Sequence, residues 1–359
     1  MYSLVKEGRA QIKVPLGKIS KDLPVFYNPK MKENRDISLW LLNATQDTKM
    51  RMADILAASG VRGIRFALEL TKGKVGQIVM NDGNAAAAKL MQQNVKLNKI
   101  KKSVVVTNND AKRFLLESTG FDYIDIDPFG SPNPFLDPAM ERISRNGILA
   151  ITATDTAALA GTAPGACKWK YWATPMHSEL MHEIGLRILI RKAQLIGTQY
   201  RRALIPLLSY AKDHYMRAFF RCVKSKAKAE KIFEQHHYVH ACDQCGKHAV
   251  SFYNTLQCDC KHKMKSAGPI WIGALGDGEL LQHANTSLLT MLREENTVPG
   301  VGFYDLHSLA SRWKFGNHKP MANLFEAVRA NGYKAARTHF SPTGIKTDMP
   351  LEELKLLLS

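Results

Sequence analysis

The first half of the chain alternates short apolar segments with segments in which apolar residues recur at helical spacing. The apolar segments are rich in β-branched residues and predict strands at 51–57, 77–80, 103–107, 123–126 and 147–153. The segments between them predict helices at 63–71, 85–98, 111–119 and 138–144. This alternation favours a parallel sheet with right-handed crossovers, whose ligands bind at the carboxyl ends of the strands. We therefore expect a doubly wound α/β domain.

The second half of the chain predicts a further domain. The next elements are expected to be a helix and two antiparallel strands that close the first sheet, at 178–196, 204–208 and 214–223. A cysteine-rich segment and a helical tail follow them. We place the boundary near residue 225, so that an α/β domain covers 1–225 and a smaller α+β domain covers 226–359.

The charge of the chain indicates its partner. Among 359 residues, 50 lysines and arginines outnumber 32 acids, which gives a net charge of +18. Such an excess favours nucleic acid or an anionic membrane surface.

No apolar run reaches the roughly 18 residues that span a bilayer, and the first residues carry no apolar signal segment. We expect a cytoplasmic protein with no membrane partner and no obligate protein partner. The expected phosphate contacts are Arg191, Lys192, Arg201, Arg202, Lys224, Lys226 and Lys228.

The turn after the first predicted strand has the composition of a cofactor loop. It reads ASGVRG at 58–63, where Gly60 lets the backbone approach a ligand and the new helix offers free N–H groups. Asp82 comes 22 residues after Gly60, which suits an acid that holds a ribose hydroxyl. Asp110 ends the third strand and is placed to meet an adenine edge, while Asp54 lies in the first strand. S-adenosylmethionine fits this loop better than a nicotinamide dinucleotide; ordinary βα turns are the alternative.

The loop after the fourth strand carries the candidate chemistry. It reads DPFGSP at 127–132 and is similar to the [DN]-P-P-[YF] motif of amino-group methyltransferases. An exocyclic base amine is a poor nucleophile because its lone pair is delocalised into the ring. The Asp127 carboxylate and the carbonyl before or at Pro128 would accept its N–H groups and aim the lone pair at a methyl donor. Asp127 would also accept the proton, and Phe129 would stack on the unstacked base. The alternative is a strand end with a structural aspartate.

Several strings together resemble those of the tRNA (guanine-N2)-dimethyltransferase family. They are VFYNPKM at 25–31, NRD at 34–36, DPFGSP at 127–132, ATDTA at 153–157, GT at 161–162, KY at 170–171, HEIGLRIL at 182–189, PLLS at 206–209 and DHY at 213–215. The resemblance implies a class I, Rossmann-like, S-adenosylmethionine-dependent methyltransferase domain and a carboxy-terminal tRNA-binding domain. It also implies transfer of one and then a second methyl group to N2 of guanosine at tRNA position 26.

The same resemblance implies roles for single residues. The cofactor site that it implies consists of Arg35, Arg62, Arg65, Asp82, Asp110 and Ala111, beside Asp54 and Gly60 of the loop region. Asp127 would hold the target amine, and Phe26 and Phe129 would sandwich the guanine. Because Arg62 and Arg65 lie three residues apart on one helical turn, we expect only one of them to reach the cofactor. Core packing is the alternative for Phe26, and a surface charge for Arg35.

Four clustered cysteines predict a metal site. The cysteines follow a C-x2-C-x12-C-x-C spacing and are Cys242, Cys245, Cys258 and Cys260. Four thiolates at such spacing suit a structural, tetrahedral Zn²⁺ with no open position, in a module at about 240–262. Free thiols, a disulfide or an iron–sulfur site are the alternatives. The spare ligands are His240, His248 and His262.

We therefore expect a tRNA guanine-N2 methyltransferase. The rivals are an amino-methyltransferase that acts on DNA adenine or protein glutamine, and a non-catalytic RNA-binding protein with a decayed cofactor site. Three aromatic residues in the second half are expected to pack in cores rather than stack on bases: Trp271, Trp313 and Phe315.

Overall fold

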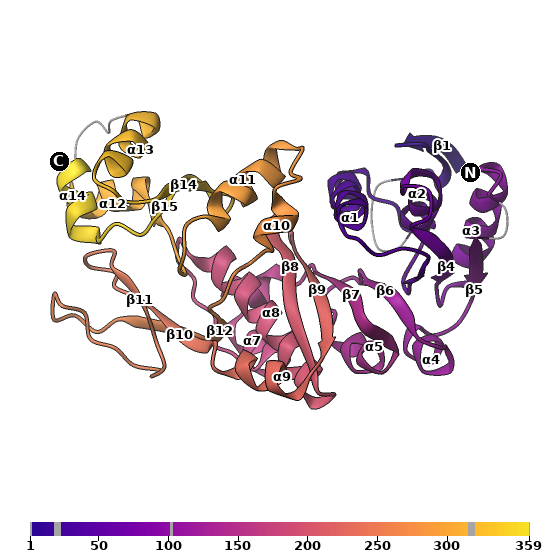
Figure 1. Cartoon of the computed structure of the whole chain (residues 1–359), viewed down its shortest axis with the longest axis horizontal. Coiled ribbons are helices and arrows are strands. Elements are labelled where there is room, and N and C mark those ends of the chain that lie inside the picture. The colour runs from indigo at the N-terminus through magenta and orange to yellow at the C-terminus, as the bar shows by residue number, and fades with distance from the viewer. Residues whose placement is uncertain (1, 18–22, 101–102, 315–319, 359) are drawn as a thin grey trace. The chain divides into compact units, whose positions relative to one another are not determined.

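The computed structural model describes residues 2–17, 23–100, 103–314 and 320–358, so Phe315 lies outside the described residues. Its largest described sheet has seven strands in the order β5-β4-β3-β6-β7-β9-β8 (Figure 1). The bounds are β3 Met50–Asp54, β4 Val75–Asn81, β5 Val104–Thr107, β6 Phe121–Ile126, β7 Ile143–Ala153, β8 Arg202–Lys212 and β9 Tyr215–Lys224. The pairs among β3 to β7 are parallel. The two-residue turn from β8 to β9 makes that hairpin antiparallel, so the predicted α/β class is confirmed.

The strand order reverses at β3. The helices between the parallel strands are α2 Val61–Glu69, α3 Ala85–Leu97, α4 Ala111–Glu117 and α5 Leu136–Arg142, with the short η2 Asn133–Phe135 before α5. Right-handed crossovers in opposite directions place α2 and α3 on one face of the sheet and α5 on the other. Helices α4 and α5 contact each other, as Figure 1 shows at the lower edge of the sheet. The reversal between β3 and β6 is the switch point where doubly wound sheets bind ligands.

Two predicted boundaries needed correction. The strand predicted at 51–57 ends at Asp54, because the chain makes a turn at Ile55 and leads through Ala58, with φ +48°, into α2. The helix predicted at 138–144 is α5, which ends at Arg142. Strand β7 begins there, since Ile143 already pairs with Phe121 of β6. The other predicted elements of the first half are confirmed to within a few residues.

The amino-terminal segment forms elements that the sequence pattern did not predict. They are β1 Tyr2–Glu7, β2 Ala10–Pro15, η1 Pro29–Met31 and α1 Lys32–Ala44. Strands β1 and β2 form an antiparallel hairpin. Asn94 of α3 accepts a 2.8 Å hydrogen bond from the backbone N–H of Lys13, and Asn98 accepts one of 2.8 Å from Gln11. These side-chain contacts attach the hairpin to α3.

The second half contains further helices and two small sheets. The helices are α6 Thr156–Leu159, α7 Pro164–Tyr171, α8 Met181–Gln199, α9 Lys226–Phe233, α10 Gly278–Leu281, α11 Ser287–Asn296, α12 Leu306–Trp313, α13 Met321–Ala330 and α14 Leu351–Leu358. The sheets are β11-β10-β12, from His248–Ser251, His236–Ala241 and Lys265–Trp271, and β13-β15-β14, from Tyr304–Asp305, Ser341–Thr347 and Ala335–Thr338. Leu309, Leu324 and Val328 pack with Ile345 and Leu354 in the core of the helical tail.

The chain forms two compact units. Unit 1 contains 1–152, 199–205 and 219–225, and unit 2 contains 153–198, 206–218 and 226–359. The assignment of a methyltransferase domain to residues 1–225 and of a tRNA-binding domain to residues 226–359 stays a prediction. Among the described residues, no helix is long and apolar enough to cross a membrane.

Candidate cofactor and acceptor site

Three acids gather where the carboxyl ends of β3 and β6 meet. Asp54 pairs with Asp125 in the strand register, and Asp127 follows two residues later. Asp54 and Asp125 are buried. The pKa of Asp54 is raised to about 7, chiefly by burial; Arg62 opposes this rise, and the charges of Asp125, Asp127 and Asp82 add to it. The switch point therefore combines concentrated negative charge with a carboxyl group that titrates near neutral pH.

Arg62 joins these acids to α1. Its Nη2 donates a hydrogen bond to Asp127, and its Nη1 lies 3.5 Å from Asp125 Oδ2. Nη1 also donates 3.0 Å hydrogen bonds to Asn34 Oδ1 and Ser38 Oγ. The guanidinium is buried, whereas the Asp127 side chain is 19% exposed. Arg62 therefore holds a carboxylate that still faces the surface, which is a suitable arrangement for a positioned acceptor.

Arg35 and Arg65 meet at a residue that sequence reasoning missed. Arg35 donates hydrogen bonds of 2.7 and 2.6 Å to the two carboxylate oxygens of Glu7, and Arg65 donates one of 3.0 Å. Tyr27 donates a further 3.0 Å bond to Glu7. Burial opposes ionisation of Glu7, but these partners outweigh it and lower its pKa. Glu7 lies 28 residues from Arg35 and 58 from Arg65, so no local signal marks the contact.

Arg65 is surrounded by acids. It also contacts Asp36 at 2.7 Å and Glu69 at 2.8 Å. Arg62 and Arg65 bind different partners: Arg62 faces the acids of the switch point, and Arg65 faces Glu7. That only one of them reaches the cofactor stays a prediction. The assignment of Arg35 and Arg65 to direct cofactor contact stays a prediction, and the structure gives both an ion-pair role.

The predicted loop residues lie along the ends of β3, β4 and β5. Gly60 adopts φ +78° at the start of α2, a left-handed conformation that suits glycine. Asp82 accepts 2.9 Å hydrogen bonds from the backbone N–H groups of Ala58 and Asn84, so it fixes the loop. Asp110 caps α4 by accepting 3.0 Å bonds from two backbone N–H groups, and the buried Ala111 begins that helix. Each acid therefore has a structural role beside the predicted cofactor role.

The two predicted stacking residues contact each other. The ring centroids of Phe26 and Phe129 lie 4.6 Å apart with the planes at 81°, so the contact is edge to face. Phe129 is 63% exposed, and Pro128 precedes it in the loop after β6. A base between two parallel rings needs about 7 Å between their centroids, since each layer adds about 3.5 Å. One ring must therefore move before the predicted sandwich can form.

The four cysteines form a compact cluster in unit 2. Their sulfur atoms all lie within 4.8 Å of one another. The Sγ–Sγ distances include 3.5 Å for Cys242–Cys260, 3.4 Å for Cys245–Cys258 and 3.7 Å for Cys245–Cys260. Tetrahedral Zn²⁺ with bonds of about 2.3 Å requires about 3.8 Å between sulfurs, whereas a disulfide requires about 2.05 Å. The donor set therefore fits structural zinc.

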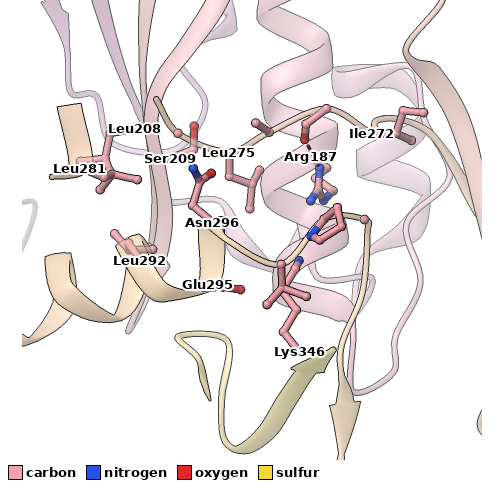
Figure 2. A pocket seen from close by; sticks show the side chains of 16 residues that line it. Arg187, Leu208, Ser209, Ile272, Leu275, Leu281, Leu292, Glu295, Asn296 and Lys346 are labelled. Carbon is pink, nitrogen blue, oxygen red and sulfur yellow. Dashed lines mark hydrogen bonds between the residues drawn. The ribbon is translucent and has the colours of Figure 1, made fainter. Parts of the chain in front are cut away.

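A separate cavity of about 260 Å³ lies elsewhere in unit 2 (Figure 2). Ser209 and Asn296 lie together at one side of the view, with Arg187 and Lys346 at the other. Both cations pair with the carboxylate of Glu183, whose Oε1 lies 2.9 Å from Arg187 and 3.6 Å from Lys346. Burial opposes ionisation of Glu183, but these cations and a backbone N–H outweigh it and lower its pKa to about 2. We interpret the charged side of this cavity as a buried ion-pair cluster.

Comparisons with known proteins agree with the resemblance seen in the sequence. A family model described as N2,N2-dimethylguanosine tRNA methyltransferase matches residues 8–359. A tRNA (guanine(26)-N(2))-dimethyltransferase of Pyrococcus furiosus is 40% identical over 380 residues, covering 97% of this chain and 96% of that protein. A tRNA (guanine(26)-N(2)/guanine(27)-N(2))-dimethyltransferase of Aquifex aeolicus is 36% identical, covering 98% and 94%.

A solved structure extends the similarity to the fold. It is Trm1 from Pyrococcus horikoshii in complex with S-adenosyl-L-methionine, which is 36% identical and superposes with a TM-score of 0.87. The match covers 99% of this chain and all of that chain. Both the sequence and the fold are thus shared over almost the whole length, and the chain belongs to the N2,N2-dimethylguanosine tRNA methyltransferase family.

Proposed function

We propose that this chain transfers one and then a second methyl group from S-adenosylmethionine to N2 of guanosine at position 26 of tRNA. The structural observation that supports it best is the Asp127 carboxylate, bound by buried Arg62 at the switch point of the sheet. The names of the relatives from Pyrococcus furiosus and Aquifex aeolicus point to the same acceptor. Neither rival acceptor, DNA adenine or protein glutamine, has a comparable observation in its favour.

The residues at the strand ends fit S-adenosylmethionine. The cofactor carries a positively charged sulfonium and an ammonium group, and the acids at Asp54 and Asp82 lie at the place where such sheets bind ligands. Gly60 adopts the left-handed turn that begins α2, whose first backbone N–H groups face the strand ends. We assign the cofactor site to this loop, Asp82 and Asp110. Arg35 and Arg65 support the site through their ion pairs with Glu7. When bound, the sulfonium supplies an electrophilic methyl group.

Asp127 and its loop prepare the acceptor. One carboxylate oxygen is held by Arg62, and the other is available to accept an N–H of the guanine amine. That hydrogen bond concentrates the lone pair on N2 and orients it. The nitrogen forms a bond to the methyl carbon as the carbon–sulfur bond breaks, and the proton passes to Asp127 or to water. A second turnover on the same nitrogen has one N–H left to bind, so Asp127 is the acceptor that both turnovers share.

Phe26 and Phe129 provide the base site. Their edge-to-face contact separates when the guanine enters, and each ring then stacks on one face of the base. Because Phe129 is exposed on a loop, it is the ring that moves more easily. The basic surface of the chain supplies affinity for the tRNA backbone, and the carboxy-terminal part from about residue 226 carries the zinc module. We place this reaction in the cytoplasm.

The test is methyl transfer to unmodified tRNA. The full chain is incubated with labelled S-adenosylmethionine and a tRNA transcript, and the product nucleosides are separated. We expect label in N2-methyl- and then N2,N2-dimethylguanosine, and none in a transcript whose guanosine 26 is replaced by adenosine. Label that persists in that transcript and disappears when guanosine 27 is replaced would move the target by one position. Label on another nucleoside, or none with cofactor bound, would overturn the proposal.

A further inference from the structure

A second cavity, of about 370 Å³, lies at the end of α7 in unit 2. This volume is within the range of small-molecule sites. Lys168 and Trp172 line it from α7 and its C-cap, and Tyr238, Asn254 and Ser266 line it from β10 to β12. The backbones of Thr174 and Gly268 exchange hydrogen bonds of 2.8 and 2.7 Å, which fixes the end of α7 against β12. The remaining lining residues are Ala173, Thr174, Ala267, Gly268 and Pro269.

Trp172 has an unfavourable backbone conformation. It is the C-cap of α7, with φ +55° and ψ +40°, and its N–H donates to the carbonyl of Lys168. Glycine or asparagine is the stable choice in this left-handed position, because a larger side chain costs free energy there. The indole is also 48% exposed, so core packing does not repay that cost. A strained, exposed aromatic residue beside a cavity points to a function in binding.

One cation packs on the indole and a second binds the backbone of the same residue. The ammonium of Lys192 lies 2.9 Å from the ring centroid of Trp172, and Lys192 is only 5% exposed. Arg191 donates a 3.2 Å hydrogen bond to the Trp172 carbonyl oxygen. These positions correct the assignment of Lys192 to a phosphate contact, since its ammonium lies beneath the ring. A cation on one face of an indole fixes its orientation and leaves the exposed surface for another flat group.

The charge of the cavity selects the class of ligand. Lys168 is exposed at its rim, and none of the described residues that line the cavity is acidic. An aromatic surface beside a lysine matches a nucleotide, whose base stacks and whose phosphate is anionic. RNA-binding proteins read unpaired bases in this way, and the loops of a folded tRNA provide them.

We propose that Trp172 and Lys168 bind an unpaired nucleotide of the tRNA, outside the acceptor site. The base stacks on the exposed surface of the Trp172 indole, and its phosphate lies at the Lys168 ammonium. Tyr238, Asn254 and Ser266 supply polar groups toward the base edge. This inference rests on the proposed function, because it takes the tRNA as the ligand, and it makes Trp172 a positioning residue rather than a catalytic one.

The same helix provides a matched control. Trp169 lies one turn before Trp172 and is 68% exposed, but it does not line the cavity. Lys170 lies 5.4 Å from the Trp169 ring centroid and forms a 3.2 Å ion pair with Asp155. Trp169→Ala therefore removes an exposed indole that lies on the same helix and beside a lysine, without changing the proposed nucleotide site.

The experiment measures tRNA affinity, cofactor affinity and methyl transfer on the same full-length variants. Trp172→Ala should weaken tRNA binding by roughly 5- to 150-fold, since a stacked base contributes about 1–3 kcal/mol. Its S-adenosylmethionine affinity and its salt slope should stay unchanged, because stacking releases no counterions. Trp172→Phe should restore most of the affinity, and Trp169→Ala should stay within about 2-fold of wild type. Lys168→Gln should reduce the salt slope by about one.

Trp172→Gly separates binding from folding. Glycine tolerates φ +55°, so this variant keeps the backbone and should lose tRNA affinity as Trp172→Ala does. Wild-type affinity in the Trp172 variants, with tRNA methylated by wild type, would overturn this inference and leave the proposed function intact. Equal losses in Trp169→Ala and Trp172→Ala would overturn it as well. A wild-type chain that binds cofactor but neither binds nor methylates tRNA would overturn both.

Discussion

Arg62 donates a hydrogen bond to Asp127 across the point where the sheet reverses its strand order. The arginine comes from the first turn of α2, and the aspartate comes from the loop after β6, 65 residues later. The contact links the loop predicted to hold the cofactor with the loop predicted to hold the amine. Because Arg62 also binds Asn34 and Ser38 of α1, the aspartate is positioned by two helices through one side chain.

Replacing Asp127 should separate chemistry from binding. Asp127→Ala should lower kcat by about 10²- to 10⁴-fold, the usual contribution of a positioned general base. Arg62 keeps Asp125, Asn34 and Ser38 as partners, so the fold should persist. Steady-state methyl transfer gives kcat, and calorimetry gives the cofactor Kd, which should stay within a few fold. Asp137→Asn, on the exposed side of α5, is the control and should behave as wild type. Substantial turnover by Asp127→Ala would remove this residue from the mechanism.

Glu7 should contribute strongly to stability. Glu7→Gln leaves Arg35 and Arg65 buried with less compensating charge, and breaking a buried ion pair costs about 3–5 kcal/mol. Denaturant unfolding measures the free energy of unfolding. The control is Glu117→Gln, which breaks the exposed pair with Arg113 and should barely move the unfolding midpoint. Similar midpoints for the two variants would show that the Glu7 cluster is not a stabilising element.

Asp54 should make stability depend on pH in the opposite direction from an ordinary ion-paired carboxylate. Its pKa is raised from 3.8 to about 7, so folding favours the protonated form. The stabilising effect is complete below pH 3.8 and is lost as pH rises to about 7. Asp54→Asn should therefore raise the melting temperature of the cofactor-free chain at pH 8 and change it little near pH 4. Cofactor affinity should fall in the same variant, and a lower melting temperature at pH 8 would contradict the raised pKa.

The cysteine cluster should bind one zinc ion per chain. Cys242→Ser removes one of four ligands and should lose the metal and lower the melting temperature, because a closed structural site contributes directly to folding. Cys222→Ala is the control, since this buried thiol in β9 lies outside the cluster. Metal analysis by mass spectrometry and thermal unfolding provide the two measurements. Unchanged zinc content in Cys242→Ser would show that the cluster was misinterpreted.

Much of unit 1 could be predicted because its signals are local. The parallel strands contain short, mostly apolar segments, and Asp82, Asp110 and Asp127 follow the strands at the edge where ligands bind. The position of the switch point depends on the strand order, which the structure supplies. Glu7 could not be predicted, because its partners Arg35 and Arg65 come from other elements and no spacing rule connects them.

The second half was less predictable for two physical reasons. Strand β10 reads HHYVHA and β11 reads HAVS, so neither has the apolar run or clean alternation that marks a strand. Trp172 gives no sequence signal of its left-handed backbone, since tryptophan is among the residues least expected there. The four cysteines were predictable because metal ligands recur at short, fixed spacings.

The contact between Phe26 and Phe129 has a consequence for how the proposed base site discriminates. In the free protein each ring contacts the other, so an entering base must first replace an aromatic contact worth about 0.5–1.5 kcal/mol. A stacked base contributes about 1–3 kcal/mol, so a base that stacks on both rings repays this cost, whereas one that reaches a single ring gains little. The pair therefore favours a base held between both rings over one that touches only one of them.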